Sequence, residues 1–228
     1  MCTLTWHRDQ GRGLEVFFNR DEKKSRPIAA VPAEFREHGI NFLSPRDPAG
    51  GGTWMLVNER GWVVCLLNKW ELEGRLEGKT KQSRGRLVWS LGGVGSFAEI
   101  EAALVELENY PAFRLVVYSP ESEQCWDWDG RELVRDVPTM PMTSSSYRFE
   151  EVRAHREGVF GKGARGEEYH ASPGSEPSAY TVRMCRGDAQ TWSRSHVVVG
   201  QRITWDYLAE QPDLIGLPER TRIELCRR

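Results

Sequence analysis

The sequence has little net charge and no long hydrophobic run. It carries 31 basic and 33 acidic residues among 228, for a formal net charge of −2. This balance lacks the basic surface typical of nucleic-acid binding and the polybasic segment typical of membrane-surface binding. The longest apolar segment, 62–67, is much shorter than the ~20 residues that cross a bilayer. We therefore expect no nucleic-acid partner and no stable membrane insertion.

The sequence also lacks signals for secretion, disulfide bonds and metal binding. Its N-terminal residues have no basic stretch followed by an apolar one, so they do not predict a secretory signal. The five cysteines are an odd number and form no CxxC pair, which favours reduced thiols. The histidines show no metal-ligand spacing. We expect a cytoplasmic protein with no metal and no cofactor.

The order of predicted elements indicates one α+β domain spanning residues 1–228. The expected strands are 2–7, 14–18, 53–57, 62–67, 113–118, 124–129, 132–134, 180–185, 191–199 and 202–205. The expected helices are 83–91, 96–108 and 147–159. The glycine- and proline-containing segments 26–52 and 161–178 are expected as loops, the first with one short strand and the second mobile. This order predicts two sheets between helical layers.

Cys2 is the first candidate for chemistry. If Met1 is removed, Cys2 carries both a thiol and a free α-amino group. An α-amine titrates near ~7.7–8 and can act as a general base toward its own side chain. The alternative is that a small second residue is merely tolerated after the initiator.

The polar tetrad Asn19–Glu22 follows the second expected strand. Antiparallel pairing of the first two strands brings the end of the second beside Cys2. Arg20 would then lower the pKa of the thiol, and Asp21 would hold and orient the α-ammonium. The alternative is a solvated strand end with a local salt bridge.

Asn68 ends the apolar strand 62–67, and its side-chain amide suits an oxyanion donor for acyl transfer. The alternative is a turn-forming asparagine that caps the strand. The glycine run in 50–54 permits close approach of the main chain to a ligand or to the Cys2 strand.

Several of these motifs, in this order, resemble the NRDE family, also described as transport and Golgi organisation protein 2-like. The resemblance spans roughly residues 1–205. The matching segments are Met1–Thr3, Asn19–Glu22, Ser25–Pro27, Gly51–Trp54, Gly61–Asn68, Ser83–Gly85 and Asp188–Ser193.

That family is in turn similar to the cholylglycine-hydrolase branch of the N-terminal-nucleophile (Ntn) hydrolases, which cleave linear amides with an N-terminal cysteine. The resemblance implies a four-layer αββα sandwich of two mainly antiparallel sheets. It implies catalytic roles for Cys2, Arg20, Asp21 and Asn68, and for Arg194 in a Ser-Arg dipeptide. This chain departs from the pattern at Ser144, where the hydrolases carry an asparagine.

The expected function is that of an N-terminal-cysteine amidohydrolase acting on a non-peptide C–N bond of a small-molecule amide. The alternative is a non-catalytic carrier for haem, lipid or another hydrophobic ligand, or a secretory-pathway organising factor that keeps the fold. A soluble sandwich with another role is the third possibility. Nothing in the sequence indicates an oligomeric state.

Overall fold

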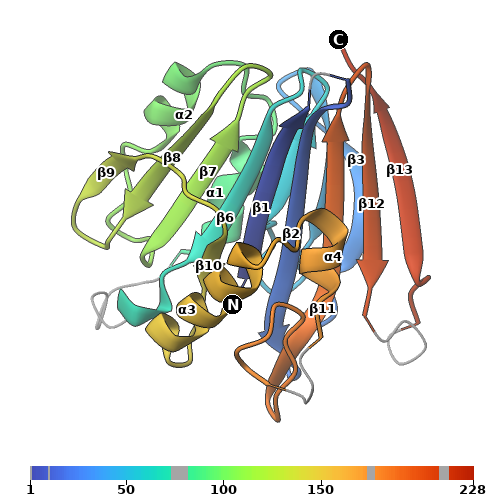
Figure 1. Ribbon diagram of the computed structural model, residues 1–228. Coiled ribbons are helices and arrows are strands. Elements are labelled where there is room, and N and C mark those ends of the chain that lie inside the picture. Colours follow the sequence, from blue (N-terminus) through green and yellow to red (C-terminus); the bar gives the residue numbers. More distant parts are fainter. Residues whose placement is uncertain (1, 10, 73–81, 174–177, 211–215) are drawn as a thin grey trace. The chain divides into compact units, whose positions relative to one another are not determined.

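The computed structural model describes residues 2–9, 11–72, 82–173, 178–210 and 216–228. These residues form two large sheets and a few helices (Figure 1). The chain divides into two compact units, one made of 1–26, 139–200 and 204–222 and the other of 27–138, 201–203 and 223–228. That residues 1–228 fold as a single domain stays a prediction. In the described residues, no helix is long and apolar enough to span a membrane.

The first unit holds most of a six-stranded sheet in the order β10-β1-β2-β11-β12-β13, of which the start of β12 and the end of β13 are assigned to the second unit. Its strands are β1 (Cys2–Asp9), β2 (Gly13–Lys23), β10 (Met142–Ser144), β11 (Ala189–Val199), β12 (Arg202–Ala209) and β13 (Arg220–Cys226). Helices α3 (Phe149–Gly161) and α4 (Gly166–Ala171) pack on the part of the sheet formed by β10, β1 and β2 (Figure 1).

The hairpin of β1 and β2 places the N-terminal cysteine beside the polar tetrad. Its turn needs Gly13, which has a φ of 89° and whose Cβ would lie 2.2 Å from the carbonyl oxygen of Val199. β2 continues to Lys23 because its pairing with β11 extends to Ala189. The prediction that this strand ends at residue 18 is therefore wrong, and the tetrad lies within the strand.

The second unit is built on a seven-stranded sheet in the order β3-β4-β5-β6-β7-β8-β9. Its strands are β3 (Ala30–Glu37), β4 (Ile40–Arg46), β5 (Met55–Asn58), β6 (Val63–Asn68), β7 (Phe113–Tyr118), β8 (Glu123–Trp128) and β9 (Leu133–Asp136). Its helices are α1 (Arg84–Ser90) and α2 (Phe97–Ala103). Aliphatic and aromatic side chains from both helices and five of the strands form its buried core. This unit confirms the predicted hairpin of 53–57 and 62–67 and the three strands after it.

Two short segments of the family pattern meet in this unit. The Cβ of a side chain at Gly52 would lie 2.1 Å from the carbonyl carbon of Gly85, and Thr53 N donates to Gly85 O at 3.0 Å. The close approach that the glycine run permits is therefore made to the start of α1. Ser96 caps α2 and accepts a hydrogen bond from Glu99 N at 3.2 Å, but the helix ends at Ala103, well before the predicted residue 108.

Segment 26–52 is not the predicted loop with one short strand, because it forms the hairpin of β3 and β4. The turn uses His38 and Gly39, both at positive φ. Pro32 is tolerated because β3 lies at the edge of the sheet, where a missing N–H breaks no inner ladder. The proline content of this segment therefore led to the prediction of a loop where the chain forms a pair of strands.

Two further predictions are wrong in the first unit, and one strand was not predicted. Segment 180–185 is not a strand: Cys185 makes only an isolated bridge, and Thr181 Oγ1 bonds two carbonyls of its own loop. Within 161–178, helix α4 replaces part of the expected loop, and 174–177 lie outside the described residues. Strand β10 was not predicted, because three residues are too few for a recognisable alternation.

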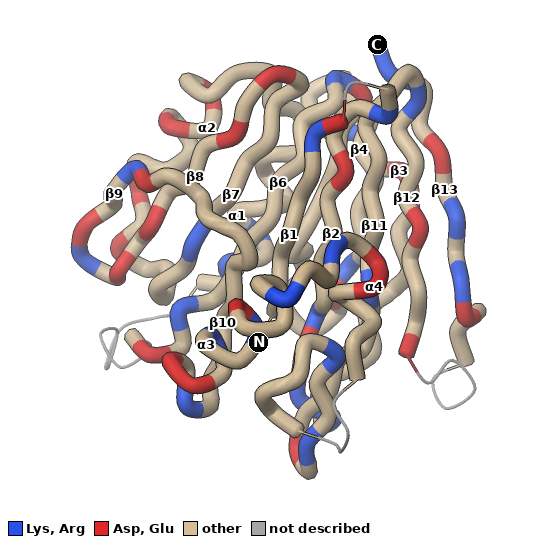
Figure 2. Tube along the Cα trace, viewed as in Figure 1, with Lys and Arg blue, Asp and Glu red and all other residues tan. Residues whose placement is uncertain are grey.

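The edge strand β13 was also not predicted, although its charged residues Arg220, Arg222 and Glu224 alternate with Thr221, Ile223 and Leu225 as in a half-buried strand. Asp206 on β12 accepts from Arg220 at 2.9 Å, and Arg222 lies 3.5 Å from it. Acidic and basic residues are interspersed along this strand in Figure 2. Such charges protect an edge from pairing with another chain.

Candidate active site

Four neighbouring strands of the first unit align one row of buried side chains. Cys2 on β1 is the Cα partner of Ser144 on β10 and of Arg20 on β2, and Arg20 is the partner of Ser193 on β11. Directly paired residues point to the same face of a sheet. All four are at most 7% exposed. The structure therefore brings the predicted residues Cys2, Arg20 and Ser144 together.

The surroundings of the thiol favour its protonated form while Met1 is attached. Burial raises the pKa of the Cys2 thiol, and the Asp21 carboxylate acts in the same direction. A hydrogen bond from the Asp21 backbone N–H and the charge of Arg20 lower it, but burial outweighs them. In the 228-residue chain the nitrogen of Cys2 is an amide, so an α-amine base exists only after Met1 is removed.

Asp21 is held by a buried cluster that sequence reasoning missed. Arg156 on α3 donates to Asp21 Oδ2 at 3.2 Å and to Thr3 Oγ1 at 2.5 Å, and Thr191 Oγ1 donates to Asp21 Oδ1 at 2.7 Å. The side chains of Arg156 and Asp21 are both 0% exposed. The helical spacing from the buried Val152 indicates that Arg156 is buried, but it does not indicate that Asp21 is its partner.

Asn19, the first residue of the tetrad, anchors helix α4. Its side-chain nitrogen donates to the carbonyls of His170 and Val182, so its oxygen accepts from His170 Nδ1 at 2.7 Å. His170 Nε2 then accepts from Thr5 Oγ1 at 2.8 Å, which fixes one neutral tautomer. Burial lowers the pKa of His170 to about 3, and nearby arginines add to the shift. Asn19 therefore has a structural role distinct from that of Arg20 and Asp21.

The structure does not bring Arg194 to the thiol. Arg194 is the Cα partner of Asn19, so it lies on the face of the sheet opposite Cys2 and Arg20. Its Nε donates to Glu210 at 2.7 Å, and its Nη1 lies 3.8 Å from Glu167 of α4. The side chain that reaches the Asp21 carboxylate is instead Arg156.

Asn68 belongs to the second unit. It ends β6 and is the Cα partner of Phe113 on β7. Its role as an oxyanion donor stays a prediction from the sequence. Across the part of the chain that the structure describes, no group of three or more His, Cys, Asp or Glu side chains is arranged to hold a metal ion.

Solved structures share this fold. The chain is similar to the conjugated bile acid hydrolase of Clostridium perfringens, with a TM-score of 0.57 and 12% identity to one variant, covering 99% of this chain and 92% of that one. A second variant of that enzyme gives a TM-score of 0.52 at 12% identity, covering 99% and 98%. An N-acylethanolamine-hydrolyzing acid amidase orthologue of Caenorhabditis elegans gives 0.57 at 8% identity, covering 87% and 92%. At these identities the likeness shows the fold alone.

The fold is therefore that of the Ntn hydrolases, an α+β fold with two large antiparallel sheets, as the sequence predicts. Within this class, residues 1–151 match the family model described as Transport and Golgi organisation 2. The match covers more than half of the chain, and the protein belongs to this family. No curated protein matches the sequence.

Proposed function

We propose that the protein, once Met1 is removed, is an N-terminal-cysteine amidohydrolase that cleaves the linear amide of a small molecule. The observation that carries the proposal is the position of Asp21. Its carboxylate is fixed by Arg156 and Thr191, its backbone N–H faces the Cys2 thiol, and its neighbour Arg20 pairs with Cys2 across the hairpin. By the alternation of β2 the carboxylate lies on the sheet face opposite the Cys2 side chain, where Arg156 also donates to the main-chain carbonyl of Cys2 at 3.5 Å. A carboxylate held in this place can orient the main-chain α-amine that appears when Met1 leaves, rather than contact the thiol itself.

The proposed reaction uses the α-amine as the base. It takes the thiol proton as the Cys2 sulfur attacks the amide carbonyl, and a carbon–sulfur bond forms. The tetrahedral intermediate collapses when the α-ammonium returns the proton to the leaving amine. Water then attacks the thioester, with the α-amine again as base, and releases a carboxylic acid and the free thiol.

Ser144 and Arg20 are the proposed substrate-facing groups of the first unit. Ser144 Oγ is buried and has no hydrogen-bond partner among the described residues, although it lies opposite Cys2. Such a hydroxyl is free to bond a substrate. Arg20 carries a positive charge beside the thiol and favours its thiolate form. Asn68 is retained as the predicted oxyanion donor.

The test is to trap the acyl-enzyme. Protein with an N-terminal Cys2, prepared by co-expression with a methionine aminopeptidase, is incubated with a set of N-acyl-4-nitroanilides and quenched in acid. Intact-mass analysis should show one acyl adduct, which forms with release of nitroaniline. Hydroxylamine should then remove this adduct. The chain that retains Met1 should form no adduct, and neither should Cys2→Ala.

The control for stray thiol chemistry follows from the exposure of the other cysteines. Cys226 is exposed and Cys185 is partly buried, whereas Cys65 and Cys125 are buried. The experiment therefore uses a background with Cys226→Ser and Cys185→Ser. An adduct that persists in Cys2→Ala within this background would overturn the proposal.

A carrier that keeps the fold without the reaction is the second candidate. Ser144 favours it, because the related hydrolases carry an asparagine at this place in the sequence pattern. In that case processed protein binds a hydrophobic ligand but releases no nitroaniline. Titration with haemin, followed by the Soret band, tests one such ligand.

A further inference from the structure

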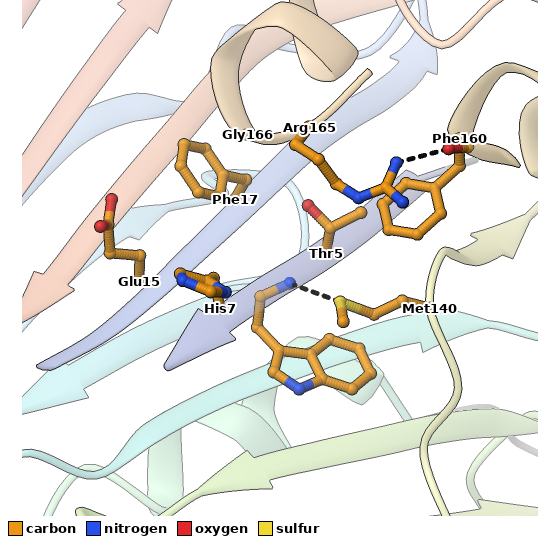
Figure 3. A pocket seen from close by; sticks show the side chains of 9 residues that line it. Thr5, His7, Glu15, Phe17, Met140, Phe160, Arg165 and Gly166 are labelled. Atoms are coloured by element: carbon orange, nitrogen blue, oxygen red, sulfur yellow. Dashed lines mark hydrogen bonds between the residues drawn. The ribbon is translucent and has the colours of Figure 1, made fainter. Parts of the chain in front are cut away.

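A cavity of about 470 Å³ lies in the first unit and takes no part in the proposed reaction. Its floor is the middle of the β1–β2 hairpin, and Phe160, Arg165 and Gly166 of the α3–α4 region also line it (Figure 3). Its volume is within the range of small-molecule sites. We propose that this cavity binds a flat aromatic carboxylate.

The walls of the cavity suit an aromatic body. Phe17 and Phe160 line it, and Met140, which is 41% exposed, lies at its edge. Phe17 is held in place by His196, with the rings stacked at 4.1 Å between centroids. Aromatic side chains that are fixed in this way bind flat rings by offset or edge-on packing.

A glycine lets the chain come close to this aromatic floor. Gly166 has a φ of 51°, and its Cβ position lies 3.2 Å from Phe17 Cζ. A side chain at Gly166 would be strained and would crowd Phe17. The glycine therefore lets the start of α4 approach the edge of the Phe17 ring without displacing it.

Arg165 supplies the charge for the carboxylate. Its guanidinium lies over the Phe160 ring, 3.8 Å from the centroid, and its Nη1 donates to the carbonyls of Phe160 and Ala164. In the described part of the chain its Nε and Nη2 make no hydrogen bond within the protein. A guanidinium that keeps two donor nitrogens for a ligand suits a carboxylate.

The acidic residue of the cavity does not oppose an anion at Arg165. Glu15 is buried, and its carboxylate lies 2.8 Å from His196 Nε2 and 3.9 Å from Arg12. In Figure 3 Glu15 lies at the left, apart from Arg165, which lies right of centre beside Phe160. The Thr5 hydroxyl is already used as a donor to His170, so it offers only an acceptor. The ligand's carboxylate therefore belongs at the Arg165 end, and its ring above Phe17.

The cavity is separate from the row of residues around Cys2. Thr5 and Phe17 are Cα partners and share a face with Thr3 and Asn19, whereas Cys2 points to the opposite face. Binding here does not need the thiol. The proposed ligand site therefore goes beyond the proposed reaction, and a failure of one proposal does not decide the other.

The experiment is isothermal titration of the full chain with 2-naphthoate and, as a matched neutral ligand, 2-naphthamide. We expect saturable binding of 2-naphthoate with one site per chain and several-fold weaker binding of 2-naphthamide. Arg165→Gln should weaken 2-naphthoate by about five- to tenfold and leave 2-naphthamide unchanged, because a charge-assisted pair is lost. Arg165→Lys should restore part of the preference.

Three further variants decide the place of binding. Phe160→Ala should weaken both ligands, and Cys2→Ala should weaken neither. Arg153→Gln, on an exposed position of α3, is the control for general charge, and it should have no effect. The proposal is overturned if 2-naphthoate does not bind at millimolar concentration, if Arg165→Gln and Arg153→Gln behave alike, or if Cys2→Ala abolishes binding.

Discussion

Arg156 Nη2 and Asp21 Oδ2 lie 3.2 Å apart, and both side chains are completely buried. The pair joins helix α3 to β2, the strand that pairs with β1 and its Cys2. Removing one partner of such a pair leaves an uncompensated charge in the protein interior, which costs about 3–5 kcal/mol. Each partner is therefore needed to compensate the charge of the other, and the pair fixes the position of Asp21 in the proposed site.

The first prediction concerns this ion pair. Arg156→Met should lower the free energy of unfolding by about 3–5 kcal/mol, because Asp21 then stays buried without its guanidinium. Urea denaturation followed by tryptophan fluorescence measures the change. Arg153→Met, one turn earlier on the exposed side of α3, is the matched control and should cost less than about 0.5 kcal/mol.

A double variant separates charge from packing. Asp21→Asn combined with Arg156→Met removes both charges and should recover part of the loss, since no buried charge then lacks a partner. Equal stability of Arg156→Met and the wild type would contradict the buried ion pair.

The second prediction concerns His170 and pH. Burial lowers the pKa of this ring from 6.5 to about 3, so its hydrogen bonds to Asn19 and Thr5 belong to the neutral form. The stability that they contribute is fully present above pH 6.5. As pH falls from there toward 3, the unfolded chain binds a proton that the folded chain does not. Stability is then lost at up to about 1.4 kcal/mol per pH unit.

Urea denaturation at several pH values between about 7 and 5 measures this slope. His170→Asn removes the titrating ring and keeps an N–H donor for Asn19. Its free energy of unfolding should depend less on pH over the same range. The same slope in both proteins would show that His170 does not titrate differently on unfolding.

The sequence predicted which residues of the candidate site lie together, but it did not predict which other side chains contact them. Cys2, Arg20 and Asp21 could be placed together, because a hairpin register is fixed by a short glycine turn and an alternating pattern. The Arg156 contact could not, since its partner lies 135 positions earlier in the chain. A helix periodicity shows that a residue is buried but does not name its partner.

Arg194 shows a second limit of sequence reasoning. The Ser-Arg dipeptide was predicted to supply a catalytic arginine, but the alternation of β11 turns Ser193 toward the Cys2 face and Arg194 away from it. A shift of one residue reverses the face of every side chain in a strand. The β-bulge between Thr191 and Ser193 sets that alternation, and no pattern in the sequence predicts the bulge.

The third prediction concerns the reactivity of the Cys2 thiol. In a Cys185→Ser and Cys226→Ser background, removal of Met1 should speed alkylation of Cys2 by iodoacetamide at neutral pH at least tenfold. The reason is that the new α-amine can take the proton that burial otherwise keeps on the sulfur. Cys125 serves as an internal control, because burial raises the pKa of its thiol to about 12. Mass spectrometry of timed samples gives the rates.

The matched control for this experiment retains Met1 and otherwise has the same sequence. Asp21→Asn in processed protein should reduce the gain, since the carboxylate no longer orients the α-amine. Equal alkylation rates with and without Met1 would contradict the proposed role of the α-amine.

The fourth prediction separates stability from reactivity at Ser144. Its hydroxyl is buried opposite Cys2 and bonds no other group among the described residues, so the folded protein gains nothing from it. Ser144→Ala should therefore change the free energy of unfolding by less than about 0.5 kcal/mol, or raise it slightly, because a buried polar atom without a partner is removed.

The same variant tests the role of Ser144 in the proposed reaction. If the hydroxyl bonds the reacting amide, Ser144→Ala should slow acyl-enzyme formation by about tenfold, the effect of one neutral hydrogen bond. Ser145→Ala is the matched control, because Ser145 Oγ donates to Tyr147 O at 2.6 Å and its loss should reduce stability instead. Unchanged acylation in Ser144→Ala would remove Ser144 from the proposed reaction and leave Cys2, Arg20 and Asp21 as its groups in this sheet.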